Sequence, residues 1–439
     1  MPREHHASRA AKVSTTTPSD WKYVSEGGAT AVFSYQGPPN PAFDGTALRL
    51  RKTSNHETKN DIHPDDPEEN EPDDPMIQFQ RDVIARLMPP QFLIELRVAD
   101  LERPWMEAFA AYHEPSRPPA RREADSIDVT RKKGIQVEDL VGNEGWSVEI
   151  KPKWGFLPSP AYLSPETLPI KTRTCRTCMH SHLRQSKGEV AAANYCPLDL
   201  FSGTEERVKR AIHGLWDSWN ESGGTINNLR IFSGGRMLKP MDIEQLETWS
   251  QKTFGTGHHA QAELRDKFTA ALLPITLGTS LLQRVGALQR TLDSFDREGF
   301  SELRERAWSM RPPVVSDREQ SGSSSISDVN EPEPTFPEWF SFINTFTSPD
   351  TSDTAFPDPA DFPYYLQAYL LSATFKDCSV MIKMPSNPEQ QVVVKVIDLD
   401  VKSVKKLRQW EKLDQQIVEV YSQVGLDARK TCIDAWAIT

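Results

Sequence analysis

Two lysines in the segment "VEIKPKWGF", residues 148–156, are the first residues whose type and spacing point to chemistry. Glu149, Lys151 and Lys153 alternate along the predicted end of a strand, so their side chains lie on one face. Pro152 stiffens the exit of that strand. An acid beside two bases can form a salt-bridge ladder on the surface. Alternatively, the acid can contact a nucleotide while the two lysines bind phosphate groups.

A second group consists of acids at the ends of strands. In "KVIDLDVKSVKKL" an apolar strand ends in Asp398 and Asp400, and a helix follows directly. Carboxylates in such a position are typical ligands of Mg²⁺, although an Asp before a helix also serves as an N-cap. Asp377 in "ATFKDCS" precedes another strand, where it fits either a base or a turn residue.

Basic residues gather in three clusters, although the chain carries a formal charge of −11. That balance argues against a general nucleic-acid binder, whose affinity depends on many phosphate contacts. It does not exclude a small, highly charged anion, because local charge decides that interaction. The clusters fit one convergent anion pocket or three unrelated solvated faces. They are Lys151 and Lys153; Lys171, Arg173, Arg176, His180, His182, Arg184 and Lys187; and Lys402, Lys405, Lys406 and Arg408.

The middle cluster contains a pattern that resembles a zinc site. "KTRTCRTCMHSHLR", residues 171–184, places Cys175 and Cys178 close to His180 and His182. Structural zinc sites bring in a distant second pair of ligands, and here only Cys196 offers help. If the segment is helical, Arg176, His180 and Arg184 line one face, which suits polyanion binding better.

Two adjacent glycines, Gly27 and Gly28, separate two predicted strands in "SEGGATAVFSY". They let the backbone approach a phosphate, but a hairpin turn uses the same letters. The alternating basic strand "TALRLRK", residues 46–52, supports the phosphate loop, because in kinase-like folds a strand cation pairs with nucleotide phosphates. Further along, Asn227, Asn228 and Arg230 lead into another strand.

These residues need a scaffold, and the 439 residues are ample for two packed lobes. Apolar content is 37 % and prolines number 34, which indicates a globular core interrupted by long loops. No run approaches the roughly 18 apolar residues that span a bilayer, and the N-terminus lacks an apolar signal core. Five thinly spread cysteines fit a reducing compartment. We expect a soluble, intracellular protein.

The pattern predicts an α+β fold of two lobes. Residues 1–20 are predicted as a disordered leader, and residues 21–155 as a β-rich N-lobe with a disordered acidic insertion at 54–75. Residues 76–93 have helical spacing, and two strands flank a turn at Gly142 and Gly145. Residues 156–439 form a mainly helical C-lobe with a disordered break at 311–334 and a final β-hairpin. Its predicted helices are 203–219, 242–252, 260–271, 280–308, 362–371 and 403–424.

Taken together, the motifs closely resemble those of inositol-pentakisphosphate 2-kinases. Six blocks match in order: "EGGAT" with "LRLRK", "EIKPKWGF", "CRTCMHSHLR", "YCPLDLFSG", "NNLRIFSGG", and "KDCSVMIKM" with "IDLDVKSVKKLRQWEKLDQQIVEVY". The resemblance covers residues 21–52 and 76–439. It implies a two-lobed, distantly protein-kinase-like fold in which "PLDLFSG" is a structural corner of the second lobe.

The resemblance also implies a nucleotide site. Gly27, Gly28 and Ala29 would form the loop over the ATP phosphates, with Thr30 in place of the family's usual Asn. Arg49 would take the role of the strand cation, and the hinge would lie at residues 137–140. The remaining nucleotide contacts implied are Glu149, Asn228 and Arg230.

For the inositol phosphate the resemblance implies a set of mostly basic residues. Asp377 would accept or orient the proton of the 2-hydroxyl, and Asp398 would bind Mg²⁺. Arg184 replaces the more usual Lys, and Trp410 replaces an aromatic residue with a hydroxyl. A zinc site before Asp377, known in some members, is not carried over, because that interval lacks cysteines. The substrate contacts implied are Arg121, Lys151, Lys153, His180, Arg184, Asn227, Lys402 and Lys406.

The implied activity is transfer of a phosphoryl group from ATP to the 2-hydroxyl of inositol 1,3,4,5,6-pentakisphosphate, with Mg²⁺, giving the hexakisphosphate. The alternative is a non-catalytic scaffold that binds inositol polyphosphates, which the departures at Thr30, Arg184, Lys406 and Trp410 keep open. An ordinary protein kinase is disfavoured, because His-Arg-Asp and Asp-Phe-Gly segments are absent. We expect a monomer in the nucleus or cytoplasm, with the nucleus favoured, and no membrane or nucleic-acid partner.

Overall fold

The computed structural model describes residues 11–55, 71–142, 145–192, 194–257, 261–310, 331–348, 357–387 and 389–436. They form a mixed α+β structure with two sheets, as expected. The strands are β1 (Ala11–Lys12), β2 (Trp21–Glu26), β3 (Thr30–Tyr35), β4 (Thr46–Ser54), β5 (Leu96–Asp100), β6 (Asp125–Ile127), β7 (Lys133–Glu138), β8 (Trp146–Ile150), β9 (Leu229–Ser233), β10 (Arg236–Leu238), β11 (Ser379–Met384) and β12 (Val393–Ile397).

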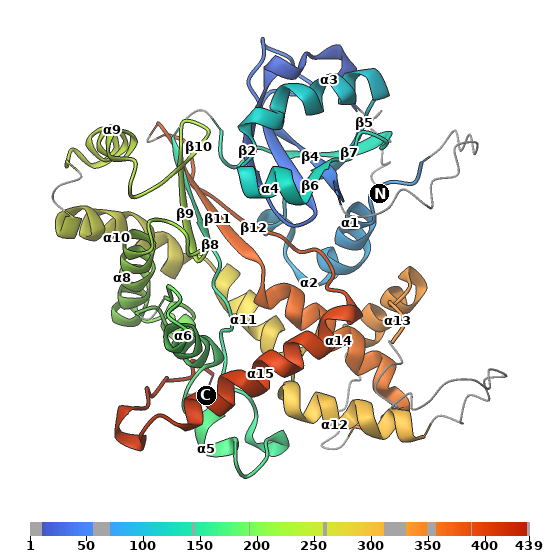
Figure 1. The fold of residues 1–439 in the computed structure, drawn as a ribbon, viewed down its shortest axis with the longest axis vertical. Helices are drawn as coiled ribbons and strands as arrows, with labels where there is room; N and C mark the ends of the chain where they lie inside the picture. The colour runs from blue at the N-terminus through green and yellow to red at the C-terminus, as the bar shows by residue number, and fades with distance from the viewer. Residues whose placement is uncertain are drawn as a thin grey trace.

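The longer helices lie mostly in the second half of the chain (Figure 1). They are α1 (Pro75–Phe79), α2 (Ala85–Leu87), α3 (Arg103–His113), α4 (Pro119–Ala124), α5 (Leu168–Lys171), α6 (Arg176–Ser186), α7 (Pro197–Leu200), α8 (Glu205–Glu221), α9 (Ile243–Phe254), α10 (Gln261–Gly278), α11 (Leu281–Thr291), α12 (Asp296–Ser309), α13 (Phe336–Phe346), α14 (Phe362–Lys376) and α15 (Leu407–Ser422).

The first sheet has the strand order β1-β5-β7-β4-β3-β2, with β6 beside β4. Its pairs are antiparallel except β1 with β5. Strand β4 shows why the sequence pattern worked here: Leu48 and Leu50 are buried, while Arg49 and Arg51 on the opposite face are partly exposed. The two leucines pack with Phe109 of α3, which covers one face of this sheet (Figure 1).

The second sheet is antiparallel, with the order β10-β9-β8-β11-β12. Its central strand β8 is buried along its whole length. Val148 and Ile150 face a core made with the helices, whereas Glu149 alternates to the opposite face. On that face Phe232 and Met381 pack in an apolar cluster with residues of the first sheet. The cluster between the sheets also contains Val24, Ala47, Ile135, Val137, Leu140 and Val141.

Helical periodicity accounts for the main core. Helix α8 buries Val208, Ile212, Leu215 and Trp219 at spacings of three and four residues, so one stripe of the helix faces inward. Helix α14 is buried on nearly all sides. Within the described residues no single helix is long and apolar enough to cross a membrane, although the bent pair Gln261–Gly278 and Leu281–Ser309 passes that test by length and composition alone.

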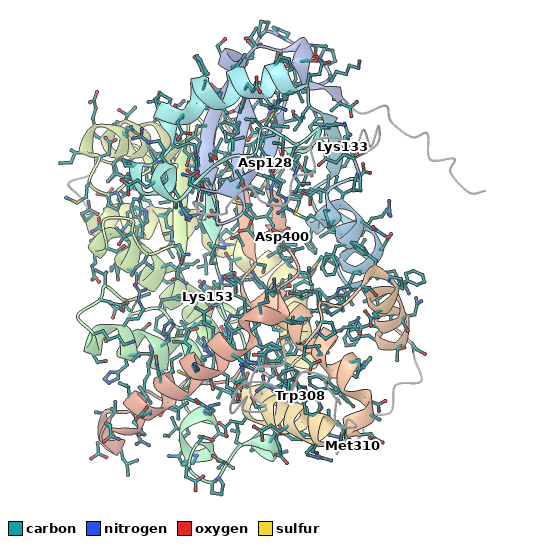
Figure 2. All side chains as sticks on the ribbon, turned by 45° about the vertical axis from the view of Figure 1, so that its right-hand side comes forward. Asp128, Lys133, Lys153, Trp308, Met310 and Asp400 are labelled. Atoms are coloured by element: carbon teal, nitrogen blue, oxygen red, sulfur yellow. The ribbon has the colours of Figure 1, made fainter. Side chains whose placement is uncertain are left out.

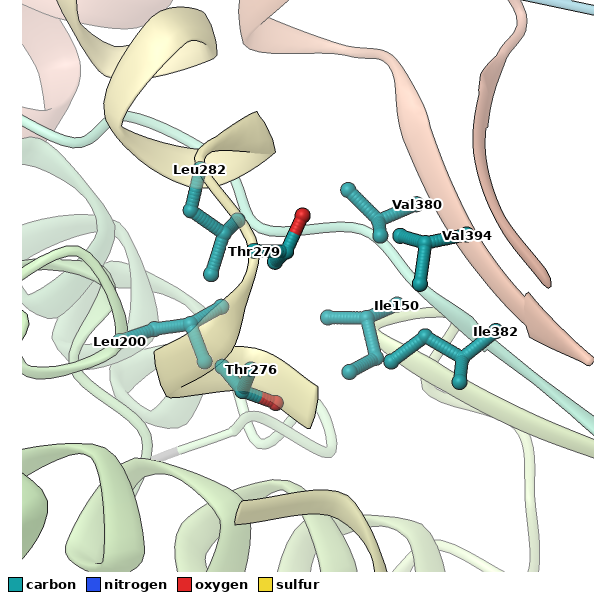
Figure 3. Close-up of a pocket in the computed structure, with 8 residues that line it drawn as sticks. All are labelled: Ile150, Leu200, Thr276, Thr279, Leu282, Val380, Ile382 and Val394. Carbon is teal, nitrogen blue, oxygen red and sulfur yellow. The ribbon is translucent and has the colours of Figure 1, made fainter. Parts of the chain in front are cut away.

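A small apolar cavity, with room for about one water molecule, lies between β8, β11 and helices α10 and α11 (Figure 3). Its volume is about 10 Å³. Aliphatic side chains and two threonines line it, without a charged group. It is a packing defect behind the second sheet and has no chemistry to offer a ligand.

Three sequence predictions need correction. The leader is ordered from residue 11, because Val13 is fully buried and β1 pairs with β5; residues 1–10 lie outside the described residues. Strand β8, predicted as part of the N-lobe that ends at residue 155, pairs into the second sheet, so the chain leaves the first sheet after β7. The helix predicted at 280–308 is broken, because Asp296 has a φ of 56° and buried Asp293 pairs with Lys376.

The predicted acidic insertion and the predicted break fall largely outside the described residues, at 56–70 and 311–330. Their described flanks make contacts: Asp74 pairs with Arg51 at 2.6 Å, and Glu71 pairs with Arg131 at 2.9 Å. The final hairpin is confirmed as β11 and β12.

Candidate active site

The acids predicted to do chemistry meet at one end of the β11–β12 hairpin. Asp377 ends α14 just before β11, and Asp398 follows β12 directly. Because Ser379 pairs with Ile397, the two acids lie at the same end of the hairpin. Asp398 has a φ of 61°, a left-handed conformation that is uncommon outside glycine and concentrates at functional sites.

Three lysines from two distant segments converge on these acids. Lys151 Nζ lies 3.1 Å from Asp398 Oδ2, and Lys402 Nζ lies 2.7 Å from Asp377 Oδ2. Lys153 Nζ is 3.6 Å from Asp377 Oδ1. Of the three basic clusters that could share one anion pocket, the first and the last meet here, whereas Lys171 of the middle cluster is buried elsewhere, paired with Asp296 and Asp414.

The local charges keep both acids ionised. Burial alone would raise the pKa of Asp377, but Lys402 and Lys153 outweigh it and lower that pKa. Burial likewise opposes Lys151 and Arg49, which together lower the pKa of Asp398. The pKa of Lys153 is itself lowered, by burial first and by the neighbouring lysines. Three ammonium groups so close together favour additional negative charge.

The backbone of the lysine segment is irregular, yet its polar groups are satisfied one after another. Lys151 and Asn228 are joined by two hydrogen bonds. Lys151 N donates to the Asn228 carbonyl at 3.0 Å, and Asn228 Nδ2 donates to the Lys151 carbonyl at 3.1 Å. The Tyr195 hydroxyl donates to the Pro152 carbonyl at 2.7 Å. Lys153 has a φ of 64°, so its conformation is imposed by these surroundings.

Gln289 on α11 continues this support. Its Nε2 donates to the Lys153 carbonyl and to the Phe375 carbonyl, both at 2.9 Å, and its Oε1 accepts from Gly155 N at 2.8 Å. The amide thereby links the lysine segment to the end of α14, where Asp377 lies. A Cβ on Gly155 would come within 2.6 Å of the Phe201 ring, so "PLDLFSG" packs directly against this segment, as a structural corner would.

The first sheet reaches the site through Arg49. Its NH2 lies 3.7 Å from Asp400 Oδ2 and donates to Thr30 Oγ1 at 3.5 Å. Its Nε is buried and has no hydrogen-bond partner among the described residues. A buried donor without a partner is costly, so an anionic ligand at this point would satisfy it. Figure 2 labels Asp400 and Lys153, which lie between the first sheet and the lower helices.

The glycine loop joins β2 to β3 beside this arginine. Gly27 N donates to the Thr30 carbonyl at 2.9 Å, which closes a tight turn that contains Gly28 and Ala29. A Cβ on Gly27 or Gly28 would meet no described atom within 4 Å, and neither needs a positive φ. Protein packing therefore does not require glycine here, whereas close approach of a ligand would.

Glu149 connects the two sides of the site. Its Oε2 accepts from Arg230 NH1 at 3.1 Å, and its Oε1 accepts from the Ser379 hydroxyl at 2.7 Å. Ser379 also donates to Asp398 Oδ2 at 3.2 Å. The acid thus orients Arg230 towards the hairpin end that carries Asp398.

The CMH segment forms helix α6, as the polyanion interpretation requires. Its apolar face packs on α15, and Arg176, His180 and Arg184 lie on a partly exposed face. Burial, and then the charges of Arg176, Arg184 and Lys153, lower the pKa of His180 to about 4. His180 therefore lies within electrostatic reach of the lysine cluster. Arg184 Nε pairs with Oε2 of Glu189, just beyond the end of α6, at 3.0 Å.

Other predicted residues are not joined to the cluster by a contact. Arg121 lies on α4. Its charge acts on Tyr23: burial and Glu26 raise the pKa of Tyr23, and the charges of Arg117 and Arg121 partly offset that rise. Asn227 and Lys406 are exposed.

The predicted hinge at residues 137–140 does connect the two sheets. Asp139 N donates at 2.9 Å to the carbonyl of Gly45, just before β4 of the first sheet, and Lys383 of β11 donates to the Asp139 carbonyl at 2.9 Å.

Sequence reasoning missed the residues that position the site. Ser379, Gln289 and Tyr195 carry no motif, because a single polar residue in an apolar segment has many structural uses. Of these three residues, Ser379 was the one that the sequence could best have indicated, because it lies two residues after Asp377 at the start of a predicted strand.

Comparison with known proteins identifies the family. The family model described as inositol-pentakisphosphate 2-kinase matches residues 23–416. An inositol-pentakisphosphate 2-kinase of Cryptococcus neoformans is 32 % identical over 421 residues, which cover 92 % of this chain and 93 % of that protein. One of Arabidopsis thaliana is 25 % identical over 462 residues, covering 92 % and 94 %. One of Danio rerio is 41 % identical over 92 residues, covering 21 % and 17 %. This chain is a kinase and belongs to the inositol-pentakisphosphate 2-kinase family.

Proposed function

We propose that this kinase transfers the γ-phosphoryl group of ATP to the 2-hydroxyl of inositol 1,3,4,5,6-pentakisphosphate, yielding inositol hexakisphosphate. The observation that carries the proposal is the convergence of Lys151, Lys153 and Lys402 on Asp377 and Asp398. Such a substrate holds on the order of eight negative charges, since each phosphate carries roughly 1.5–2. Several cations must therefore meet at one place.

The lysines are paired with carboxylates in the free protein, so substrate binding exchanges one anionic partner for another. Lys153 and Lys402 would pass from Asp377 to substrate phosphates, and His180 would add a donor from α6. Asp377, half exposed and ionised, would then be free to accept or orient the proton of the attacking hydroxyl. In phosphoryl transfer, the protein contributes mainly by positioning the reactants and stabilising the charge of the transition state.

The nucleotide would bind between the two sheets, in a kinase-like arrangement of two lobes. Arg49, with its unsatisfied Nε, and Arg230 would meet the phosphates under the loop of Gly27, Gly28 and Ala29. The apolar cluster between the sheets, which includes Val24, Ala47, Val137, Phe232 and Met381, would pack against the base. An apolar slot with a few convergent polar groups is the usual form of such a site.

The donor set also fits a magnesium ion. The contacts of Asp398 all use Oδ2, which leaves Oδ1 as the oxygen available to a cation, and Asp400 supplies a second carboxylate. When bound, the ion would neutralise phosphate charge. Asp398 would hold it, and Lys151 and Ser379 would fix the orientation of Asp398 through their contacts with Oδ2.

The decisive experiment incubates the purified protein with Mg-ATP and inositol 1,3,4,5,6-pentakisphosphate and resolves the product isomers by chromatography. The proposal expects the hexakisphosphate as the product. Tight binding of the pentakisphosphate without turnover would instead establish the alternative, a scaffold that binds inositol polyphosphates. A monomeric state and a nuclear or cytoplasmic location stay predictions.

A further inference from the structure

Four charged side chains form a closed ring at the base of the glycine loop. Two cations, Lys52 and Arg117, each contact the same two acids, Glu26 and Asp125. Lys52 Nζ lies 2.9 Å from Glu26 Oε2 and 2.9 Å from Asp125 Oδ2. Arg117 NH2 lies 2.9 Å from Glu26 Oε2 and also contacts Asp125 Oδ1. These four residues, called the charge ring below, have side chains that are at most 12 % exposed.

The charge ring joins three separate segments of the chain. Glu26 is the last residue of β2 and directly precedes the glycine loop. Lys52 lies on β4, the strand that also carries Arg49. Arg117 lies just before α4, and Asp125 follows that helix directly. The loop, the strand of the cation and both ends of α4 are therefore connected at one point.

Helix α4 needs such contacts, because it buries none of its own residues. A surface helix is normally oriented by a buried apolar stripe, which α4 lacks. Arg117 NH1 donates to the Asp125 carbonyl at 3.0 Å, so the residues on either side of α4 are also bonded to each other. Asn55 Nδ2 adds one hydrogen bond to the Arg122 carbonyl at 3.0 Å, on the exposed side. The charge ring thus fixes both ends of α4 to the first sheet.

Helix α4 carries a cation that the protein itself leaves without an acid. Arg121 is partly exposed, and no acid among the described residues lies within ion-pair distance of its guanidinium. Its positive charge acts on Tyr23, whose hydroxyl donates to Glu26 Oε1 at 3.4 Å. Arg121 therefore lies close to the end of β2, where the glycine loop begins. An arginine without an acid beside such a loop is suited to a ligand phosphate, which its planar fork can bind through two hydrogen bonds.

The charge ring specifies orientation more than it adds stability. Buried charges lose their hydration, and apolar residues of the same volume often stabilise a fold equally well. The planar guanidinium of Arg117, in contrast, meets its acids in only a few directions. Its Nε donates to both carboxylate oxygens of Glu26 at 3.3 Å, in addition to the contact of NH2. The start of α4 is thereby fixed in distance and angle against the residue that begins the loop.

We propose that the charge ring positions Arg121 against the glycine loop, so that this arginine binds a phosphate of the polyphosphate substrate while the loop holds the phosphates of ATP. The inference rests on the proposed function, which supplies both ligands. Arg117 is then a positioning residue: it is buried, touches no ligand and acts through Arg121.

The test removes one cation and one acid together, so that the ring stays neutral. The paired variant Glu26→Gln/Arg117→Met keeps Lys52 and Asp125 as an ion pair. In the wild-type background, Arg121→Ala should raise the KM for the pentakisphosphate by about 10-fold or more. In the paired variant the same substitution should raise it by less than about threefold, because Arg121 is no longer held in place. Equal effects of Arg121→Ala in the two backgrounds would overturn the inference.

Two further measurements separate positioning from folding. Hydrogen–deuterium exchange of the ligand-free paired variant should be faster in residues 118–124, whereas β7 should exchange as in the wild type. Arg117→Lys keeps the charge but loses the planar fork, so the KM for the pentakisphosphate should still rise. The control is Arg265→Met/Asp217→Asn, an ion pair between α10 and α8, which should leave that KM unchanged. Unchanged exchange in α4, or a lower melting temperature with a wild-type KM in both ring variants, would refute the positioning role.

The behaviour of the wild type distinguishes this inference from the proposed function. Binding of the pentakisphosphate without turnover would overturn the proposed function alone, because the same comparison can then be made with Kd values from calorimetry. Turnover by the wild type, together with equal effects of Arg121→Ala in both backgrounds, would overturn the inference alone. A wild-type protein that does not bind the pentakisphosphate would overturn both.

Discussion

The two carboxylates of the site, Asp377 and Asp398, form ion pairs with ammonium groups that would also bind the phosphates of the proposed substrate. Asp377 is paired with Lys402 and Lys153, and Asp398 with Lys151. Removing one member of this set therefore affects binding and turnover differently, depending on which charge is lost. Three predictions at the scale of single residues use this difference.

Asp377→Ala should lower kcat by about 10²- to 10⁴-fold, the usual contribution of a general base, while binding of the pentakisphosphate stays equal or tightens. Binding is spared because two lysines lose a competing anion. The measurement is kcat by product chromatography together with Kd by calorimetry. Asp427→Ala, at an exposed acid, is the control. Unchanged turnover in Asp377→Ala would exclude this residue as the base.

Lys151→Ala should weaken binding of the pentakisphosphate by about 10- to 100-fold, since a hydrogen bond to a charged group contributes roughly 1.5–3 kcal/mol. The KM for ATP should change less. Lys209→Ala on the exposed side of α8 removes the same charge elsewhere. If both variants lose affinity equally, the effect is one of overall charge and not of this site.

The pKa of His180, lowered to about 4, predicts a proton uptake on binding. The free protein keeps His180 neutral while the unfolded chain binds a proton below about pH 6.5, so this residue makes stability fall as the pH drops through that value. Substrate phosphates would raise the pKa again. Calorimetry at pH 6 in two buffers of different ionisation enthalpy should show more proton uptake for wild type than for His180→Gln. Equal uptake in both would remove His180 from the site.

At the scale of elements, the segment after β8 matters more than any of its side chains. Residues 151–157 have no regular secondary structure, so buried side chains from three other parts of the chain satisfy their backbone groups. Gln289 makes two of these hydrogen bonds and a third to the Phe375 carbonyl, and it is itself fully buried.

Gln289→Met should lower the melting temperature and raise the KM for the pentakisphosphate more than that for ATP. The exchange keeps the volume but leaves buried backbone groups unpaired, at about 1–3 kcal/mol each. Gln367→Met is a matched control, because the Nε2 of this buried glutamine has no partner among the described residues. A loss of stability with both KM values unchanged would show that Gln289 supports the fold without positioning Lys153.

Sequence reasoning recognised the elements but not how they are supported. The strands carrying Arg49 and Glu149 and the hairpin before Asp398 were expected from periodicity and motifs, whereas a helix carrying His180 was considered only as one alternative. Gln289, Tyr195 and Ser379 were not, because their roles arise from which buried carbonyl or carboxylate lies opposite. The order of residues 11–20 was missed for the same reason: Val13 needs the first sheet to be buried.

At the scale of the whole molecule, the two sheets meet across few polar contacts near the site. Arg49 to Asp400 is one, and Lys22 Nζ donating to the Gly234 carbonyl at 3.1 Å is another. Nucleotide bound between the sheets would add contacts to both. The arrangement of the sheets was beyond sequence reasoning, which grouped β8 with the strands of the N-lobe although it pairs with β9 and β11 of the second sheet.

Arg49→Ala should raise the KM for ATP by about 10- to 100-fold, because a charged donor to phosphate is lost. Asp400→Asn removes the contact between the sheets but keeps the arginine, so it separates the two roles. Equal effects in the two variants would mean that Arg49 acts by joining the sheets. Steady-state kinetics with varied ATP gives the measurement.

Leu157 N donates to Asp434 and Trp436 Nε1 donates to the Gly155 carbonyl, and these two hydrogen bonds span 277 and 281 residues of sequence. During translation, the lysine segment emerges from the ribosome long before residues 434 and 436 are synthesised. The nascent chain can therefore bury much of its core before these two hydrogen bonds to the lysine segment can form. Competence for turnover would then arise only after residues 434 and 436 have been synthesised, and a polypeptide stopped before them would be folded but inactive.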